Sequence, residues 1–262
     1  MILTDTHTHI YYEKDQTKRN VLMQRCFDHK IERLFLPNVN TATIPMVMGL
    51  CADFPGNCFA MLGLHPCDVK NAADEGNMAY PDELATIREA AKSHKICAIG
   101  EIGLDLYWDK TTLAIQQDAF RIQIEWAKEL DLPIVIHCRE AFYEIFEILT
   151  QEKHEKLRGI FHCFTGTEEQ ANKVVDIGFL LGIGGVVTYK NSGLDKVVAG
   201  IDLANIVLET DSPYLTPVPF RGKPNESSYL VYVAQKIADL KQISIDEVAR
   251  ITTENSKRIF GI

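Results

Sequence analysis

Short apolar runs in this sequence end repeatedly on a residue type that can bind a metal ion or transfer a proton. The sequence has eight histidines, and a random distribution would not place five of them at equivalent ends. The residues at these ends are His7, His9, His65, Glu101, His137, His162 and Asp211. Imidazole and carboxylate groups gathered in this way suit divalent metal ions and the activation of water.

The first histidine pair has the spacing of a β-strand. In His7-Thr8-His9 the two imidazoles are two residues apart, so both project from the same face of an extended chain. Two nitrogen ligands held in this way suit one metal ion. An isolated pair of this kind is more often a surface feature, but here it closes an apolar run that has counterparts at the other run ends.

The remaining ligand candidates extend this pair to a binuclear site. Glu101 has two carboxylate oxygens and can bridge two cations, while His137 and His162 lie one strand–helix unit apart and therefore belong to neighbouring strands. Asp211 would also orient or deprotonate the water between the ions. We predict two divalent ions held by six residues: His7, His9 and Asp211 on the first, His137 and His162 on the second, and Glu101 shared.

Three further residues are candidates for holding an anionic substrate. His65 could contact a phosphate oxygen or a leaving group, although a structural role at a strand end explains it equally well. Arg139 could clamp an anionic group, since it shares the strand face of His137, and Arg221 lies in a loop rich in Pro and Gly. Four aromatic residues that follow run ends could stack bases or line the cleft: Tyr11, Tyr12, Tyr107 and Trp108.

These residues can meet only if one sheet carries all the runs. Eight runs occur, at residues 2–9, 33–39, 59–65, 96–101, 133–137, 159–162, 179–187 and 206–211. Amphipathic segments lie between them, and Thr167 and Ser244 each begin a capping-box pattern that starts a helix. Strands that alternate with helices predict a closed, parallel (β/α)8 TIM barrel, whose site lies at the C-terminal ends of the strands.

An open, doubly wound sheet is the structural competitor. Its dinucleotide fingerprint would need a glycine at position 187 after Gly182 and Gly184, and the residue there is Val187. The chain has 262 residues without a linker or a shift in composition, and barrels of this kind typically have about 250 residues. We therefore predict one domain over residues 1–262.

The charge balance limits how the protein could attract a polyanion. With 27 Lys and Arg against 36 Asp and Glu, the formal net charge is −9. This charge argues against passive coating of nucleic acid. Two bound divalent ions would nevertheless outweigh the charges of Glu101 and Asp211 and make the site locally positive.

Cysteine usage and hydropathy indicate a cytoplasmic protein. The seven cysteines are odd in number and include no Cys-x-x-Cys pair, and the N-terminus lacks the features of a secretion signal. No apolar run approaches the ~20 residues that a membrane span requires. We expect no membrane association, and no obligate protein partner is evident.

At these residues the sequence resembles the TatD-type metal-dependent deoxyribonucleases, a branch of the amidohydrolase-like barrels. The resemblance covers nearly the whole chain and implies a hydrolase that cleaves DNA phosphodiesters, from the 3′ end of a single strand, by water activated at two metal ions. The family's metal positions fall on the six ligands predicted above. The motifs are Asp5-Thr6-His7-Thr8-His9, Gly63-Leu64-His65-Pro66, Gly100-Glu101-Ile102-Gly103-Leu104-Asp105, His137-Cys138-Arg139, His162-Cys163-Phe164-Thr165-Gly166 and Glu209-Thr210-Asp211-Ser212-Pro213-Tyr214-Leu215.

In the mechanism that we expect, Asp211 is the general base, Glu101 holds both ions, and His65 and Arg139 hold the phosphate. The histidine-rich set suits Zn²⁺, Mn²⁺ or Fe²⁺, whereas the family's nuclease activity is associated with Mg²⁺, so the identity of the metal stays open. One position departs from the family: Ser227 stands where a proline usually follows Asn-Glu, which is expected to affect the rigidity of this loop but not the metal site.

Two other functions remain open at this stage. The first is an amidohydrolase-type enzyme acting on a lactone, an amide or an aminoacyl ester. Binuclear members of that group often bridge their metals with a modified lysine, whereas the fourth run here supplies Glu101. The second is a non-catalytic binding barrel, which would be expected to lack one or more of the six ligands.

Overall fold

The computed structural model describes residues 1–71 and 78–262. Within them, eight strands form one sheet in the order β1 to β8. The strands are β1 (Leu3–Asp5), β2 (Ile31–Pro37), β3 (Cys58–Leu62), β4 (Ala98–Asp105), β5 (Ile134–Arg139), β6 (Gly159–Phe161), β7 (Leu180–Ile183) and β8 (Ile206–Leu208). The helices are α1 (Gln16–Asp28), α2 (Ile44–Asp53), α3 (Tyr80–Ser93), α4 (Leu113–Leu130), α5 (Phe142–Gln151), α6 (Glu168–Asp176), α7 (Leu194–Gly200), α8 (Leu230–Lys241) and α9 (Ile245–Phe260).

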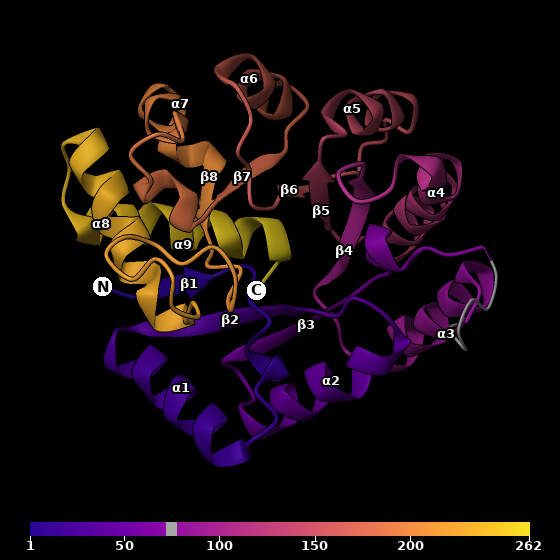
Figure 1. The fold of residues 1–262 in the computed structure, drawn as a ribbon, viewed down its shortest axis with the longest axis horizontal. Helices are drawn as coiled ribbons and strands as arrows, with labels where there is room; N and C mark the ends of the chain where they lie inside the picture. Colours follow the sequence, from indigo (N-terminus) through magenta and orange to yellow (C-terminus); the bar gives the residue numbers. More distant parts are fainter. Residues whose placement is uncertain (72–77) are drawn as a thin grey trace. The chain divides into compact units, whose positions relative to one another are not determined.

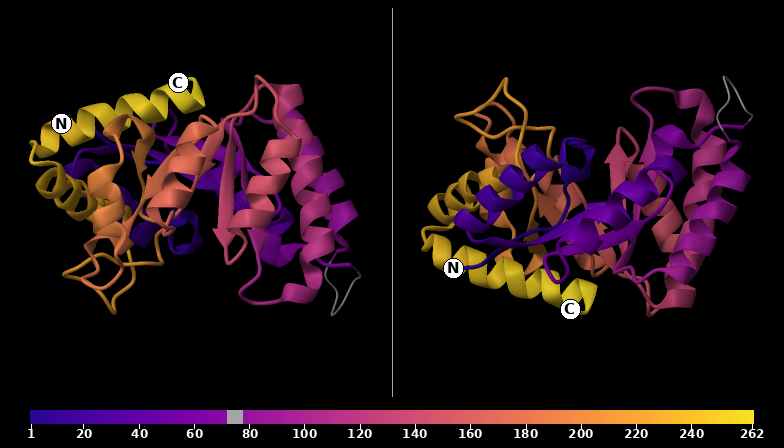
Figure 2. Two further views of the ribbon diagram at one scale, coloured as in Figure 1. Left: turned by 90° about the horizontal axis from the view of Figure 1, so that it is seen from above. Right: turned by 90° about the horizontal axis from the view of Figure 1, so that it is seen from below.

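One compact unit is made of Met1–Leu36, Leu50–Phe59 and His162–Ile262. Within it β1 pairs with β2, β7 pairs with β8, and the amide of Thr6 donates to the carbonyl of Leu208 at 2.9 Å, which joins β8 back to β1. Helix α9 packs on β1 and β8, and α8 packs on α9 (Figure 1). Figure 2 shows the N-terminus at the beginning of α9, where the Met1 ammonium lies 3.6 Å from the Asp246 carboxylate.

The other compact unit is made of Pro37–Gly49 and Ala60–Phe161. In it β3, β4, β5 and β6 pair in parallel and in chain order. All eight residues of β4 are buried, as expected for a parallel strand that is covered on both faces. Helix α4 packs on β4 and buries Phe120 and Ile124 completely. Burial of each such side chain contributes roughly 1.5–3 kcal/mol to the free energy of folding.

The strand order confirms the predicted fold class. Parallel strands in chain order, with β8 bonded back to β1, have the topology of a (β/α)8 TIM barrel. Each of the eight predicted runs overlaps one of these strands. The predicted capping box at Thr167 is also present, and Ser244 caps α9 by accepting from the amide of Glu247. That residues 1–262 are one domain stays a prediction.

Several predicted strands were too long at their C-terminal ends. Strand β1 ends at Asp5, so His7 and His9 follow the strand instead of belonging to it, and β7 ends at Ile183 because a 3-10 helix begins at Gly185. Beyond Asp5 the amides of Thr6 and Thr8 still bond to the carbonyls of Leu208 and Phe35, but the chain no longer forms a regular strand. None of the helices described here is long and apolar enough to cross a membrane.

Gly103 is predicted to be essential for the β4–β5 pairing. Its φ is +142°, and an added Cβ would overlap the carbonyl oxygen of His137. Gly103→Ala should therefore lower the free energy of unfolding by at least about 2 kcal/mol. Urea unfolding followed by circular dichroism measures this change.

Gly49→Ala is the matched control. Gly49 lies in α2, and no described atom is within 4 Å of an added Cβ. Alanine there should raise the stability by about 0.5–1 kcal/mol, because it restricts the unfolded chain more than glycine does. Equal unfolding midpoints for the two variants would contradict the assigned role of Gly103.

Candidate metal centre

The first group of candidate ligands, called the His9 cluster, consists of His7, His9 and Asp211. Backbone hydrogen bonds build it: the amide of Asp211 donates to the carbonyl of His7 at 2.9 Å, and the amide of His9 donates to the carbonyl of Ser212 at 2.8 Å. These bonds continue the pairing of β1 and β8 beyond the strands. As a result, one ligand atom of each residue lies within 4.8 Å of the others.

The imidazoles of this cluster converge on one carboxylate oxygen. The Nε2 atoms of His9 and His7 lie 3.5 and 3.9 Å from Oδ1 of Asp211. Nδ1 of His9 lies 2.9 Å from the hydroxyl of Tyr11, which orients the ring with Nε2 toward Asp211. Ligands about 2.1 Å from one ion are separated by about 3–4 Å, so this spacing is compatible with a shared cation.

His162 joins the cluster through His7. Their rings stack with centroids 3.7 Å apart and planes inclined by 16°, and both residues are buried. Two positively charged imidazoles in this arrangement would repel each other, whereas neutral imidazoles can present a nitrogen to a cation. The stacking therefore favours a metal-binding role for both histidines.

Three buried carboxylates surround these imidazoles. Asp5 and Glu209 are fully buried, and the side chain of Asp211 is 14% exposed. In the part of the chain that the structure describes, no Lys or Arg forms an ion pair with any of the three. Because burying an anion away from Lys and Arg is costly, Glu209 and Asp211 fit a bound cation.

The carboxyl group of Asp211 is ionised at neutral pH. Burial alone would raise its pKa, but the hydrogen bond with His9 and the proximity of His162 and His7 lower the pKa below its usual value. Its φ of +54° lies in the left-handed region, which aspartate tolerates better than most residues. Asp211 can therefore ligate a cation or accept a proton.

The second group, called the His137 cluster, consists of His65, Glu101 and His137. Oε1 of Glu101 lies 2.8 Å from Nδ1 of His137 and 3.4 Å from Nε2 of His65, and the two histidine nitrogens are 3.2 Å apart. Glu101 is 2% exposed. Glu101 and His137 lie within β4 and β5, and His65 follows β3 by three residues. The cluster offers a cation two nitrogens and one oxygen.

Asp105 holds the other side of the His137 ring. Its Oδ2 lies 2.9 Å from Nε2 of His137, while Oδ1 accepts from the amides of Tyr107 and Trp108. Burial would raise the pKa of Asp105, but the hydrogen bond with His137, the charge of that ring and the two amides lower it. A carboxylate in this position fixes the orientation of a ligating imidazole.

The sequence analysis missed two residues of this kind, Asp105 and Glu209. Glu209 lies 3.3 Å from Nδ1 of His162 and also accepts from the amide of Cys163. Gly182 leaves room for it, because a Cβ there would overlap the carboxylate. The signal was available: Asp105 follows Glu101 by four residues and Glu209 precedes Asp211 by two, so each has the strand parity of a ligand candidate.

The predicted substrate-binding residues lie in different surroundings. His65 belongs to the His137 cluster, where its ring nitrogen could also serve as a metal ligand. The guanidinium groups of Arg139 and Arg221 are exposed and lie over the rings of Tyr107 and Tyr189, at 3.7 and 4.1 Å from the ring centroids. These stacking contacts orient both arginines.

Ser227, the departure from the family pattern, takes part in a buried hydroxyl chain. Its Oγ donates to Thr8 at 2.9 Å, and Thr8 lies 2.7 Å from the hydroxyl of Ser212. Proline could not donate this bond. The serine thus ties the loop that carries it to the residue between His7 and His9.

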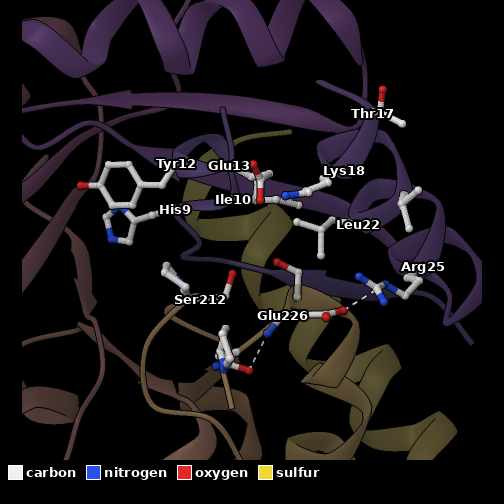
Figure 3. Close-up of a pocket in the computed structure, with 15 residues that line it drawn as sticks. His9, Ile10, Tyr12, Glu13, Thr17, Lys18, Leu22, Arg25, Ser212 and Glu226 are labelled. Carbon is white, nitrogen blue, oxygen red and sulfur yellow. Dashed lines mark hydrogen bonds and ion pairs between the residues drawn. The ribbon is translucent and has the colours of Figure 1, made fainter. Parts of the chain in front are cut away.

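A cavity of about 510 Å³ opens beside His9. Its walls come from α1 and from the segments that follow β1 and β8 (Figure 3). Lys18 and Arg25 balance Glu13 and Glu226, and Arg25 forms an ion pair with Glu226 at 3.1 Å. The volume is typical of a small-molecule pocket. It offers room next to the His9 cluster for an uncharged part of a ligand.

Comparison with known proteins places these clusters in a family. The TatD related DNase family matches residues 4–261. The chain belongs to this family. The "Uncharacterized metal-dependent hydrolase YabD" of Bacillus subtilis (strain 168) is 42% identical over 262 residues, which span the whole of both chains. The "3'-5' ssDNA/RNA exonuclease TatD" of Yersinia pseudotuberculosis is 32% identical over 219 residues, covering 81% of this chain and 82% of that one.

Solved structures agree with the family membership. The crystal structure of the TatD homologue YJJV from Escherichia coli k12 matches with a TM-score of 0.89 and 27% identity, over 99% of this chain and 98% of that chain. The resemblance found in the sequence is therefore confirmed. As a TatD family member, the chain is a metal-dependent hydrolase, and the two clusters provide nitrogen and oxygen donors that fit a divalent ion.

Asp5 is predicted to make the stability of the metal-free protein depend on pH. Burial raises its pKa from 3.8 to about 7, despite hydrogen bonds from Thr210, Ser227 and His7. Between these two pH values the folded protein keeps a proton that the unfolded chain has lost. The free energy of unfolding should therefore fall as pH rises through this window, by up to roughly 1.4 kcal/mol per pH unit.

Asp5→Asn removes this titration. In urea unfolding at pH 5, 6 and 7 with a chelator present, the variant should lose less stability with rising pH than the unmodified protein. Asp109→Asn, at an exposed aspartate, is the control and should keep the original pH dependence. Identical pH slopes for Asp5→Asn and the unmodified protein would contradict the assignment.

Metal removal is predicted to lower the melting temperature, because only the folded chain assembles the two clusters. A ligand present at 100 times its Kd stabilises a fold by about 2.7 kcal/mol. Chelation should lower Tm, and Zn²⁺ or Mn²⁺ should restore it. His9→Ala should weaken the response, whereas His29→Ala, at an exposed position on the end of α1, should keep it. An unchanged Tm after metal loss verified by elemental analysis would refute a stabilising metal site.

Proposed function

We propose that this protein hydrolyses the phosphodiester bonds of single-stranded DNA from a 3′ end. The proposal rests on one observation above all: imidazoles and carboxylates converge in the His9 cluster and again in the His137 cluster. The Yersinia pseudotuberculosis relative, whose described activity is a 3′–5′ exonuclease on single-stranded DNA and RNA, supports the choice of substrate. The proposed metal ligands are His7, His9, Glu101, His137, His162 and Asp211.

Divalent ions at these residues would lower the pKa of water and offset the charge that develops on the phosphate oxygens. Asp211 accepts the proton of the attacking water, since its low pKa keeps it ionised and its oxygen lies beside His7 and His9. Glu101 is proposed to ligate both ions. His65 positions the phosphate at the His137 cluster, where its Nε2 lies 3.4 Å from Glu101.

Arg139 and Arg221 are proposed to bind the phosphates of the strand. Each guanidinium lies over a tyrosine ring, which limits its motion before substrate arrives. Their charge is local, so an acidic protein can still bind a polyanion at these points. A cytoplasmic location is consistent with the free thiols of Cys26, Cys51, Cys58, Cys67 and Cys138.

Glu101→Ala tests the proposed function. Loss of this carboxylate should lower kcat/KM on a single-stranded oligonucleotide by more than about 100-fold, together with a lower metal content. Degradation of strands labelled at the 5′ or 3′ end, with Mg²⁺, Mn²⁺ or Zn²⁺ added, also reveals the direction of cleavage. Glu89→Ala, at an exposed glutamate of α3, is the control and should keep full activity.

Three outcomes would contradict the proposal. Full activity in Glu101→Ala would exclude Glu101 as a shared ligand. Metal-dependent turnover of a lactone or an aryl ester, without cleavage of any oligonucleotide by the same preparation, would identify an amidohydrolase-type enzyme. Absence of turnover on all these substrates, with metal bound, would indicate a binding protein.

A further inference from the structure

Two large aromatic side chains are exposed directly after β4. Tyr107 is 50% exposed and Trp108 is 72% exposed. Of the four aromatic residues that the sequence marked as candidates for stacking bases, the other two are engaged: Tyr11 is 1% exposed, and Tyr12 stacks on His9 with ring centroids 5.3 Å apart. A tryptophan as exposed as Trp108 contributes little to the core, so its ring is available to a ligand.

Arg139 organises these rings into a mixed aromatic and cationic surface. Its guanidinium carbon lies 3.7 Å from the centroid of Tyr107 and 5.4 Å from that of Trp108. The two rings meet edge to face, with centroids 4.9 Å apart and planes at 87°. We call these three residues, Tyr107, Trp108 and Arg139, the aromatic platform.

The aromatic platform is attached rigidly to the His137 cluster. The carboxylate of Asp105 binds Nε2 of His137 at 2.9 Å and accepts from the amides of Tyr107 and Trp108 at 3.0 and 3.4 Å. Asp105 also pairs in register with Arg139 between β4 and β5. One side chain therefore sets the position of the aromatic turn relative to a candidate metal ligand.

We propose that the aromatic platform stacks the unpaired bases of a single-stranded nucleic acid, next to the phosphodiester held at the His137 cluster. This inference rests on the proposed function and specifies how its substrate is gripped. Every base has a π-face that can stack on tyrosine or tryptophan, and arginine adds a cation–π contact. Bases inside a duplex are covered by their neighbours, so the platform selects single strands.

The charges around the platform favour stacking over attraction to phosphate alone. The neighbouring Lys110 ammonium lies 3.5 Å from the Glu140 carboxylate, whereas the Arg139 guanidinium lies over the rings of Tyr107 and Trp108. A guanidinium beside two exposed rings matches one base and its adjoining phosphate. The aromatic platform therefore distinguishes a strand that carries bases from an abasic strand of the same charge.

Trp108 provides a direct signal for this contact. The sequence has two tryptophans, and the other, Trp126, is buried at 7% exposure. In a Trp126→Phe protein with a chelator present, hexathymidylate should quench the fluorescence of Trp108. An abasic hexamer with the same number of phosphates, at the same salt concentration, should not quench it.

Affinity gives an independent measurement. Because stacking on one aromatic side chain contributes about 1–3 kcal/mol per base, Trp108→Ala should raise the Kd for hexathymidylate by about 5- to 150-fold. Trp108→Phe keeps a π-face and should stay within about threefold of the unmodified protein. Tyr143→Ala removes an aromatic side chain that is 61% exposed outside the platform, and should leave the Kd unchanged. Fluorescence anisotropy of a labelled oligonucleotide measures each Kd.

Equal quenching by the normal and abasic strands, or an unchanged Kd in Trp108→Ala, would overturn the platform. Cleavage by the unmodified protein with added metal tests the proposed function separately. Quenching without any cleavage would support base stacking on the aromatic platform and refute the proposed nuclease activity. Cleavage with no loss of affinity in Trp108→Ala would support the proposed nuclease activity and refute base stacking on the aromatic platform.

Discussion

The backbone bonds that continue β1 and β8 past their ends are the constraint on which the His9 cluster depends. The amides of Asp211 and His9 bond to the carbonyls of His7 and Ser212, so two distant segments are held in register where neither is a regular strand. This register brings the side chains of His7, His9 and Asp211 close together. Among the residues described, no Lys or Arg forms an ion pair with the carboxylate of Asp211 or Glu209, so a cation is their natural complement.

Three of the candidate ligands are each supported by a neighbour that restricts the histidine ring. Tyr11 orients His9, Asp105 orients His137, and Glu209 lies against His162. Such contacts reduce the entropy that a metal ion must overcome when it collects its ligands. The same contacts connect the ligands to their surroundings. The carboxylate of Asp105 binds both the His137 ring and the amides of Tyr107 and Trp108.

Much of this arrangement was accessible from the sequence, because strand ends in a parallel barrel have a recognisable pattern. The apolar runs predicted all eight strands, and the histidines and carboxylates at the ends of most runs grouped His7 with His9 and Asp211. The prediction was less accurate for local detail. Strand β1 stops at Asp5, and His65 proved to lie as close to Glu101 as a ligand would. Run length alone could not reveal either feature, because each depends on bonds to remote residues.

The sequence by itself determined the alternation of strands and helices, the family and the candidate ligands, since these follow from local hydropathy and from motifs of adjacent residues. Only the tertiary structure decided which residues support those ligands and which aromatic side chains stay exposed. Tyr11 and Trp108 both follow a strand end, yet one is buried against His9 and the other faces solvent. The difference arises because the burial of a side chain depends on which distant segments pack against it. The adjacent residues in the sequence do not reveal this packing.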